Sequence, residues 1–458
     1  MTIDERLADA LPVGALYAVG GRVRDEVRAK ISGEHPVVKD ADYVVTGVPL
    51  DALRARLERI GRVDLVGASF AVLKVTVDGA TVDVSLPRRE RSTGIAHRAF
   101  EVEGGPDVAL KDDLRRRDFR MNAMARSLPA GELVDPYGGE DDVRAARIDL
   151  IDERAFEDDP LRMLRAAQFA ARFEYVLTAR TLAAMRAAAP LAASISGERI
   201  AEELGKLLVR APRPSVGLEL LRETGVLSVV CPELVEGYGV EQNEWHAYDI
   251  WRHALESCDA APAGDLVLRL AALLHDVGKP RTKSGAHFYR HEIVGAEMAA
   301  DLLRRLRFSN DLVEKTAHLV RSHMYSADPD LSDAALRRSI RRIGVDDLER
   351  QFALRRADIA GSGLPKRDDS NERFEARVRE EVARKPAFSV VDLAIGGQDV
   401  VAAMVRMGDA PPGFRGDARV GEALRALFEE VTERPERNER QTLLALLDEH
   451  LRGSKHHA

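Results

Sequence analysis

The sequence predicts an α+β protein in which a small mixed head precedes a long, all-helical body. Strand-like segments rich in β-branched residues occur from Leu16 to about Leu150. From Arg154 onward they give way to amphipathic segments with helical spacing, rich in Ala, Leu and Arg. Because a chain of 458 residues is too long for one hydrophobic core, we expect three or four domains.

The composition is that of a globular protein, with 45% hydrophobic and 31% charged residues. No apolar run is long enough to cross a membrane, and the acidic N-terminus lacks the basic start and apolar core of a secretory signal. Cys231 and Cys258 are too few for a disulfide framework or a zinc cage. We therefore expect a cytoplasmic protein with no membrane partner, while its oligomeric state is left open.

The net charge of −8 argues against a simple non-specific nucleic-acid binder, although the distribution of charge matters more than its sum. Basic residues cluster at 115–117 and in the segment LRRSIRRIG, residues 336–344. The second cluster could contact RNA or pack within the helical body, and the sequence favours neither.

Four segments of the head have strand character, and one between them has helical spacing. The strands are expected at LYAVGG, DADYVV, FAVLKVTV and ATVDVSL, and the helix at residues 49–61.

Two acidic residues, Asp40 and Asp42, lie within the predicted strand VVKDADYVV, residues 37–45. Strand side chains alternate between faces, so both carboxylates point the same way. Two such charges repel unless a cation lies between them, and Mg²⁺ prefers hard oxygen ligands. Asp83, in another predicted strand, could supply a third carboxylate. The alternative, that the pair marks a strand end at the surface, stays open.

An apolar strand runs into Gly20 and Gly21 and then into a helix that contains Arg24. Two glycines let the backbone approach a phosphate closely, and the N–H groups at a helix start can bind an anion. Taken alone, a tight strand-to-helix turn is the simpler interpretation.

The segment DDLRRRDFRMNAMA would bring four polar residues together within about two turns if it is helical. Arginine suits a bidentate grip on phosphate, whereas Asp and Asn suit sugar hydroxyls. Taken alone, a charged helix face is the simpler interpretation. The four residues are Arg116, Arg117, Asp118 and Asn122.

The segment FEDDPLRMLRAAQF predicts a capped helix, with Asp159 as N-cap and Pro160 at the first helical position. Arg162 and Arg165 then lie on one side of it. Either the arginines are solvated, or Asp159 and Arg162 form a rigid pair that offers hydrogen bonds to a nucleobase.

A second set of metal-binding residue types lies in the helical body. A lone buried histidine is more often a satisfied core residue than a ligand, but here such residues recur on separate segments. Imidazoles and carboxylates from facing helices are suited to Mn, Fe, Co, Ni or Mg. The candidates are His253, His275 with Asp276, His291, His318 or His323, and Asp358.

In their order along the chain, these segments resemble the motifs of the class II tRNA nucleotidyltransferases, a family of the DNA polymerase β superfamily. The matching motifs are GGxxRD, DxD, RRDFxxN, DPxGG, EDxxR in altered form, and SGERIAEELGKLL at residues 196–208. The histidine set resembles the HD-domain phosphohydrolases. The resemblance implies a polymerase-β-like nucleotidyltransferase head at 1–150, a helical neck at 151–225, an HD domain at 226–364, and a linker helix with a tRNA-binding tail at 365–458.

Roles follow from the resemblance by position. Asp40 and Asp42 correspond to Mg²⁺ ligands, and Asp159 and Arg162 to the amino-acid template that reads cytosine or adenine. The HD motif implies one metal at His253, His275, Asp276 and Asp358, with His291 and His323 holding a second metal or phosphate. Residues expected to contact the nucleotide are Gly20, Gly21, Arg24, Arg117, Asp118, Asn122 and Arg165.

Two positions depart from the family pattern, since Asp158 replaces a glutamate and Gln168 stands where many members have arginine. The segment from Arg88 to Asp113 resembles the flexible loop of complete CCA-adding members, which disfavours a specialist that adds only two C residues.

The resemblance implies an enzyme that adds C, C and A to the tRNA 3′ end from CTP and ATP with Mg²⁺ and no nucleic-acid template. An A-adding specialist or a poly(A) polymerase shares the head motifs and stays open. A metal-dependent HD phosphohydrolase with an RNA-binding head is an alternative of another class. Activity of the HD domain is also open, because in this family some HD domains only support the fold.

Overall fold

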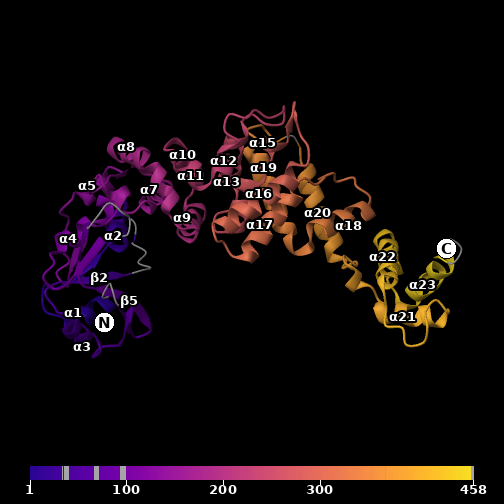
Figure 1. Cartoon of the computed structure of the whole chain (residues 1–458), viewed down its shortest axis with the longest axis horizontal. Coiled ribbons are helices and arrows are strands. Elements are labelled where there is room, and N and C mark those ends of the chain that lie inside the picture. The colour runs from indigo at the N-terminus through magenta and orange to yellow at the C-terminus, as the bar shows by residue number, and fades with distance from the viewer. Residues whose placement is uncertain (34, 36–40, 67–71, 93–99, 367, 455–458) are drawn as a thin grey trace. The chain divides into compact units, whose positions relative to one another are not determined.

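The structure, a computed structural model, describes residues 1–33, 35, 41–66, 72–92, 100–366 and 368–454. The chain divides into two compact units, whose elements are labelled in Figure 1. Unit 1 comprises Met1–Glu236 with Leu302–Phe308, and unit 2 comprises Gly237–Asp301 with Ser309–Ala458. Within the described part of the chain, no helix is long and apolar enough to cross a membrane. The predicted α+β class, with a mixed head and a helical body, is confirmed.

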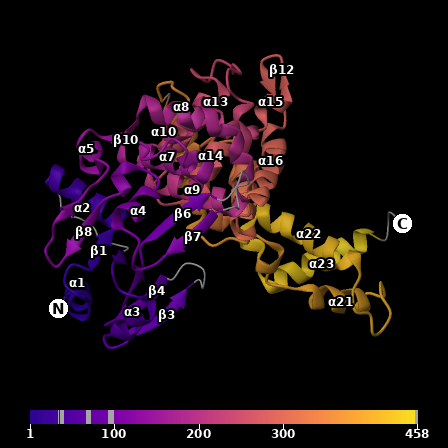
Figure 2. The same cartoon turned by 60° about the vertical axis from the view of Figure 1, so that its left-hand side comes forward.

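Unit 1 contains a seven-stranded sheet in the order β3-β4-β5-β2-β1-β8-β9. Its strands β1, β3, β4 and β8 are labelled in Figure 2. β2 and β5 run parallel, and the other neighbours run antiparallel. The four expected strands are confirmed as β1, β2, β4 and β5. The strands are β1 Leu16–Val19, β2 Asp42–Val45, β3 Arg62–Val66, β4 Val72–Val77, β5 Ala80–Ser85, β8 Ala125–Leu128 and β9 Leu133–Val134.

Three smaller sheets have two strands each. The antiparallel pair β6 and β7 lies in the segment that resembles a flexible loop, and residues 93–99 between the two strands lie outside the described residues. The short strands are β6 Arg88–Ser92, β7 Phe100–Gly104, β10 Arg147–Ile148, β11 Val176–Leu177, β12 Lys283–Ser284 and β13 His287–Phe288.

The helices of unit 1 differ from expectation in two places. The segment around Arg117 is not one helix: α4 ends at Arg115, the chain turns so that Phe119 is fully buried, and a 3₁₀ helix follows at Arg120–Asn122. Pro160 is the N-cap of α7 rather than its first residue, because Asp159 ends the short helix α6. The helices are α1 Ile3–Ala10, α2 Gly21–Ser32, α3 Leu50–Leu57, α4 Leu110–Arg115, α5 Gly139–Arg144, α6 Ala155–Asp158, α7 Leu161–Phe173, α8 Ala179–Ala188, α9 Gly197–Arg210, α10 Pro214–Glu223, α11 Val226–Val230 and α12 Pro232–Val235.

The described part of unit 2 contains helices and a single hairpin, β12-β13. One core lies among α13, α14, α17 and α19, where Leu268, Leu319 and Leu354 are buried. A separate core, which includes Val400, packs α21, α22 and α23 together. The helices are α13 Ile250–Ala260, α14 Leu266–Leu274, α15 Lys279–Thr282, α16 His291–Arg305, α17 Asn310–Ser322, α18 Asp333–Ile343, α19 Leu348–Gly361, α20 Ser370–Ala383, α21 Gly397–Arg406, α22 Ala418–Glu433 and α23 Arg440–Ser454.

The basic segment LRRSIRRIG forms most of α18 and is paired with acids inside unit 2. Arg337 is buried, where it pairs with Glu381 and donates a hydrogen bond to the carbonyl of Thr432 at 2.7 Å. Arg338 and Arg341 pair with acids of α22, Glu433 and Glu429. The packing interpretation of this segment therefore accounts for these three arginines.

Candidate active sites

A cavity of about 990 Å³ in unit 1 gathers most of the candidate nucleotide-binding residues. Its walls come from the β1-α2 turn, the start of β2, the segment after α4, and helices α7 and α9. It is lined by Gly20, Gly21, Arg22, Arg24, Asp25, Arg28, Ala29, His35, Asp42, Arg117, Asp118, Asn122, Asp159, Leu161, Arg162, Arg165, Gln168, Phe169, Arg172, Arg199, Glu203, Lys206 and Arg210.

The β1-α2 turn depends on glycine. Gly20 has a φ of +72°, a region that side chains other than glycine rarely adopt. A Cβ at this position would lie 2.7 Å from Nη1 of Arg117 and 3.8 Å from Oδ2 of Asp42. Gly20 therefore leaves room for a basic and an acidic side chain next to the start of α2, where backbone N–H groups can bind an anion.

Of the three candidate Mg²⁺ ligands, Asp42 lines the cavity, whereas Asp40 lies outside the described residues. Asp42 and Asp83 are register partners on the parallel strands β2 and β5, so their side chains leave the same face of the sheet. Asp83 is not among the described residues that line the cavity. Two neighbouring carboxylates that share one face, next to a space kept open by Gly20, fit a hard divalent cation.

Asp118 is the centre of a buried hydrogen-bond network. It accepts from Nδ2 of Asn122 at 2.9 Å and from Nε and Nη2 of Arg165 at 2.8 and 2.7 Å. Asn122 in turn accepts from Nη1 of Arg24 at 2.7 Å. Burial alone would raise the pKa of Asp118, but Arg165 and Asn122 lower it, so the group stays ionised. Asp118 thus orients two arginines that line the cavity.

Two further cavity residues, Asp159 and Arg162, are anchored by the backbone. The N–H of Leu161 donates to Oδ1 of Asp159 at 3.2 Å. Nη2 of Arg162 donates to the carbonyl of Arg116 at 2.7 Å. Asp158, the substituted position of the motif, is not among the described residues that line the cavity, and burial raises its pKa.

The sequence interpretation did not single out several residues that the fold brings to this cavity. They lie on helices α2, α7 and α9, which are far apart in the chain. Only the packing of these helices brings the residues to one cavity. Gln168, noted from sequence only as a departure, is 2% exposed, and its Nε2 has no hydrogen-bond partner. The residues not singled out include Arg28, Arg172, Arg199, Glu203, Lys206 and Arg210.

The histidines and acids of unit 2 converge in one buried cluster. Nε2 of His253 lies 3.0 Å from Nε2 of His275, 3.2 Å from Oδ1 of Asp358 and 3.4 Å from Oδ2 of Asp276. Close packing of α13 on α19 brings His253 and Asp358 together. This packing requires glycine at position 361, because a Cβ there would lie 2.1 Å from Oγ of Ser257. Burial alone would lower the pKa of His275, but Asp276 and Asp358 raise it to about 10.

The second carboxylate oxygen of Asp276 faces another pair of histidines. Oδ1 lies 3.3 Å from Nε2 of His291 and 3.7 Å from Nε2 of His323, which are 3.2 Å apart. His318, the alternative considered from sequence, instead bonds to the carbonyl of Ile343.

The orientation of these imidazoles fits a metal site. Nδ1 of His275 and of His291 each lies 2.8 Å from the carbonyl three residues earlier, and Nδ1 of His323 lies 2.6 Å from the carbonyl of Val320. A hydrogen bond from Nδ1–H to a carbonyl leaves the lone pair on Nε2, and all three Nε2 atoms point toward Asp276. The cluster can therefore offer imidazole nitrogens and carboxylates to one or two cations, and a bound cation would displace the Nε2 proton that Asp276 and Asp358 favour on His275.

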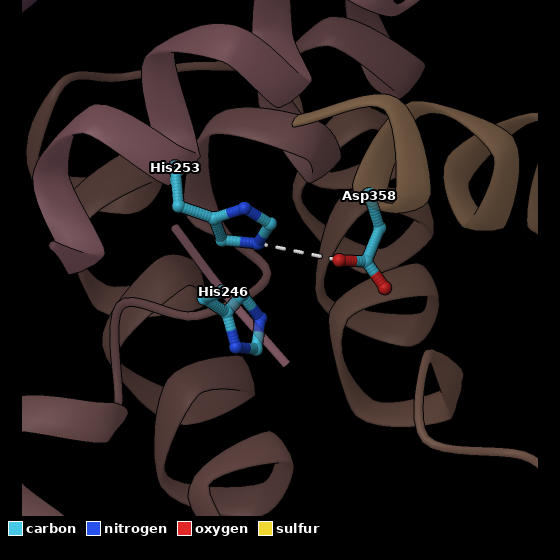
Figure 3. Close-up of side chains that lie close together, drawn as sticks. All are labelled: His246, His253 and Asp358. Atoms are coloured by element: carbon cyan, nitrogen blue, oxygen red, sulfur yellow. Dashed lines mark ion pairs between the residues drawn. The ribbon is translucent and has the colours of Figure 1, made fainter. Parts of the chain in front are cut away.

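His246 is a member of this cluster that the sequence interpretation missed. It lies in the irregular segment before α13, and Figure 3 shows its ring beside His253 and Asp358, with which it forms a possible ligand group. Its Nδ1 lies 3.0 Å from Oδ1 of Asn243. Burial, with Lys279 and His253, lowers its pKa to about 4, so the ring is neutral. No helical periodicity marked this residue.

Three family models match successive parts of the chain. The poly A polymerase head domain matches residues 16–149, the probable RNA and SrmB-binding site of polymerase A matches residues 175–237, and the HD domain matches residues 246–360.

Relatives and solved structures agree with this order. The chain is 37% identical to a multifunctional CCA protein of Cupriavidus necator over 71% of its length and 80% of the relative's. It is 36% identical to an A-adding tRNA nucleotidyltransferase of Deinococcus radiodurans, over 70% and 75% of the two chains. A CCA-adding enzyme of Bacillus stearothermophilus, solved in complex with CTP, shares the fold with a TM-score of 0.66 at 24% identity, covering 97% of this chain and 95% of that one. The chain therefore belongs to the family of the multifunctional CCA proteins, the class II tRNA nucleotidyltransferases that carry an HD domain.

Proposed function

We propose that this enzyme adds C, C and A to the 3′ end of tRNA from CTP and ATP without a nucleic-acid template. One observation carries the proposal: a single cavity of about 990 Å³ combines the Gly20 turn, Asp42 and the pair Asp159 and Arg162. These groups suit the phosphates and the base of a nucleoside triphosphate and the metal ion that accompanies its phosphates.

The basic residues of the cavity suit the triphosphate. The start of α2 offers backbone N–H groups, and Arg24, Arg117 and Arg165 offer guanidinium groups that can grip phosphate oxygens. The hydrogen bonds of Asn122 and Asp118 hold Arg24 and Arg165 in place before the nucleotide arrives.

The acidic residues on the sheet suit Mg²⁺. When bound at Asp42, and at Asp40 and Asp83 as the sequence predicts, Mg²⁺ supplies charge that activates the tRNA 3′ hydroxyl and stabilises the departing pyrophosphate. Asp42, which lines the cavity, would hold this charge beside the space that the nucleotide would occupy.

The pair Asp159 and Arg162 suits the selection of the base. Cytosine and adenine both carry an exocyclic amine, which can donate to the Asp159 carboxylate. Arg162 donates to the ring nitrogen beside that amine. Uracil presents a carbonyl oxygen at the position of the amine, so the carboxylate would repel it.

We also infer a metal-dependent phosphohydrolase activity for unit 2. The supporting observation is the convergence of Nε2 atoms from His275, His291 and His323 on the Asp276 carboxylate. When bound there, Mn, Fe, Co, Ni or Mg supplies a Lewis acid for a phosphate ester. A cytoplasmic location and tRNA as partner accord with both activities.

The test is end-labelling of three tRNA transcripts that end before CCA, after C and after CC, each with CTP, ATP or both in Mg²⁺. Extension of the shortest transcript by two C and one A is the expected result. Extension of only the CC-ended transcript, by one A, would make the protein an A-adding specialist. Extension of none would leave the phosphohydrolase as its activity.

A further inference from the structure

The base-selecting carboxylate Asp159 has a partner on another helix. Nη2 of Arg199, from the first turn of α9, lies 3.1 Å from Oδ1 and 2.9 Å from Oδ2 of Asp159. Both side chains line the cavity, and both are partly exposed to it, at 31% for Asp159 and 49% for Arg199. The pair therefore lies where a nucleobase would meet the carboxylate.

The hydrogen bonds of Asp159 restrict what else it can accept. A carboxylate offers about four lone-pair sites. On Oδ1, the backbone N–H of Leu161 and the guanidinium of Arg199 occupy both, and on Oδ2 Arg199 occupies one. One site on Oδ2 remains, which matches the single N–H that an exocyclic amine directs along the base-pairing edge.

The other member of the selecting pair is fixed in a similar way. Nη2 of Arg162 donates to the carbonyl of Arg116 at 2.7 Å, and Nη1 lies 3.4 Å from the carbonyl of Ala155. Backbone groups thus orient Arg162, whereas Asp159 needs Arg199 in addition to Leu161. The orientation of the Asp159 carboxylate therefore depends on one side chain, that of Arg199.

We propose that Arg199 is a positioning residue for nucleotide selection. It holds the Asp159 carboxylate so that its one remaining acceptor site faces the base, and it offsets the negative charge of the carboxylate. Cytosine and adenine can donate to that site, and uracil meets it with an oxygen. This inference rests on the proposed role of Asp159 in reading the base.

The experiment compares Arg199→Ala and Arg199→Lys with the unchanged enzyme in single-nucleotide addition with CTP, ATP and UTP. Loss of one charge-assisted hydrogen bond predicts about a tenfold lower kcat/KM for CTP and ATP. Because the carboxylate can then turn away from uracil, the preference for CTP over UTP falls by about tenfold. Arg199→Lys, which keeps the positive charge and N–H donors but not the planar guanidinium, restores part of this preference.

The matched control is Arg186→Ala, an exposed arginine on α8 that does not line the cavity. It should leave all three rates unchanged. An unchanged ratio of kcat/KM for CTP to that for UTP in Arg199→Ala would overturn the inference, because this ratio does not depend on the fraction of enzyme that is folded.

Asp159→Ala separates this inference from the proposed function. If Asp159→Ala relaxes selection and Arg199→Ala does not, the carboxylate reads the base without help from Arg199. If neither variant changes selection, the proposed reading of the base by Asp159 is itself wrong.

Discussion

At the scale of single residues, burial decides which side chains can serve a ligand. The carboxamide of Gln168 is almost fully buried, faces the cavity and leaves Nε2 without a partner. A buried donor without a partner costs about 1–3 kcal/mol, which a ligand that accepts the hydrogen bond recovers.

We predict that Gln168→Ala raises the KM for CTP and ATP about three- to tenfold with little change in kcat, because the lost hydrogen bond is made to ground state and transition state alike. Steady-state kinetics with a CC-ended tRNA and ATP measure the effect. An unchanged KM at an unchanged Tm would show that the amide does not contact the nucleotide.

A second prediction concerns Asp42, which is exposed at the start of β2. Asp42→Asn should reduce nucleotide addition by about 10³-fold or more, because a neutral amide binds Mg²⁺ poorly, while the Tm stays the same. The matched control is Asp64→Asn, an exposed acid on β3 of the same sheet. Addition that survives in Asp42→Asn would contradict the metal assignment.

At the scale of elements, the N-terminal helix α1 links helix α2 to strand β2, two elements that line the nucleotide cavity. The Asp4 carboxylate accepts from Nη1 of Arg22 at 2.8 Å and also from the hydroxyl of Tyr43. Arg22 follows the glycine turn on α2, and Tyr43 follows Asp42 on β2. One carboxylate of α1 thus fixes the position of α2 relative to β2.

Because Asp4 is ionised in this network, Asp4→Asn should destabilise unit 1 by about 1 kcal/mol near neutral pH. Burial alone would raise the pKa of Asp4, but Arg22 and Tyr43 lower it below 3.8. The stabilisation is present above the unfolded-state pKa and is lost as the pH falls through the folded-state pKa. Urea unfolding from pH 3 to pH 7 should therefore show a gap to the unchanged protein that closes at acidic pH.

The control on the same helix is Asp9→Asn, because Asp9 is exposed. It should show no pH-dependent gap. A gap for Asp4→Asn that does not narrow as the pH falls from 7 to 3 would mean that the effect does not come from the ionised carboxylate.

At the scale of the whole molecule, the two sites belong to different compact units with separate hydrophobic cores. The cavity uses oxygen ligands and arginines, whereas the cluster around Asp276 uses imidazoles. Oxygen ligands favour Mg²⁺, and imidazoles favour transition metals. The two proposed activities should therefore be separable by mutation and by metal.

We predict that Asp276→Asn abolishes phosphohydrolase activity and lowers bound transition metal, measured by elemental analysis, while CCA addition in Mg²⁺ continues. Asp42→Asn should abolish CCA addition and leave the phosphohydrolase activity and the bound transition metal unchanged. After chelation, Mg²⁺ alone should restore addition, and Mn, Co or Ni should restore the hydrolysis of a phosphate ester. Loss of both activities in Asp276→Asn would show that the units are not independent.

Most strands and helices that carry the two sites could be predicted from the sequence, because they depend on local patterns of residues. Alternation of β-branched residues located the strands around Asp42 and Asp83, and the apolar run before His275 located α14. Local patterns failed where burial overrode them: the fully buried Phe119 breaks the helix expected around Arg117, and His246 lies in a segment with no period.

The sequence by itself determined the fold class, the family and which residue types carry the chemistry, since motif order and periodicity are properties of the chain alone. Only the tertiary structure decided which of those residues meet. It set Asp42 beside Asp83, aimed Nε2 of His291 and His323 at Asp276, and placed Arg199 on Asp159. These contacts join residues far apart in the chain, so they exist only once the sheet register and helix packing bring their side chains within hydrogen-bond distance.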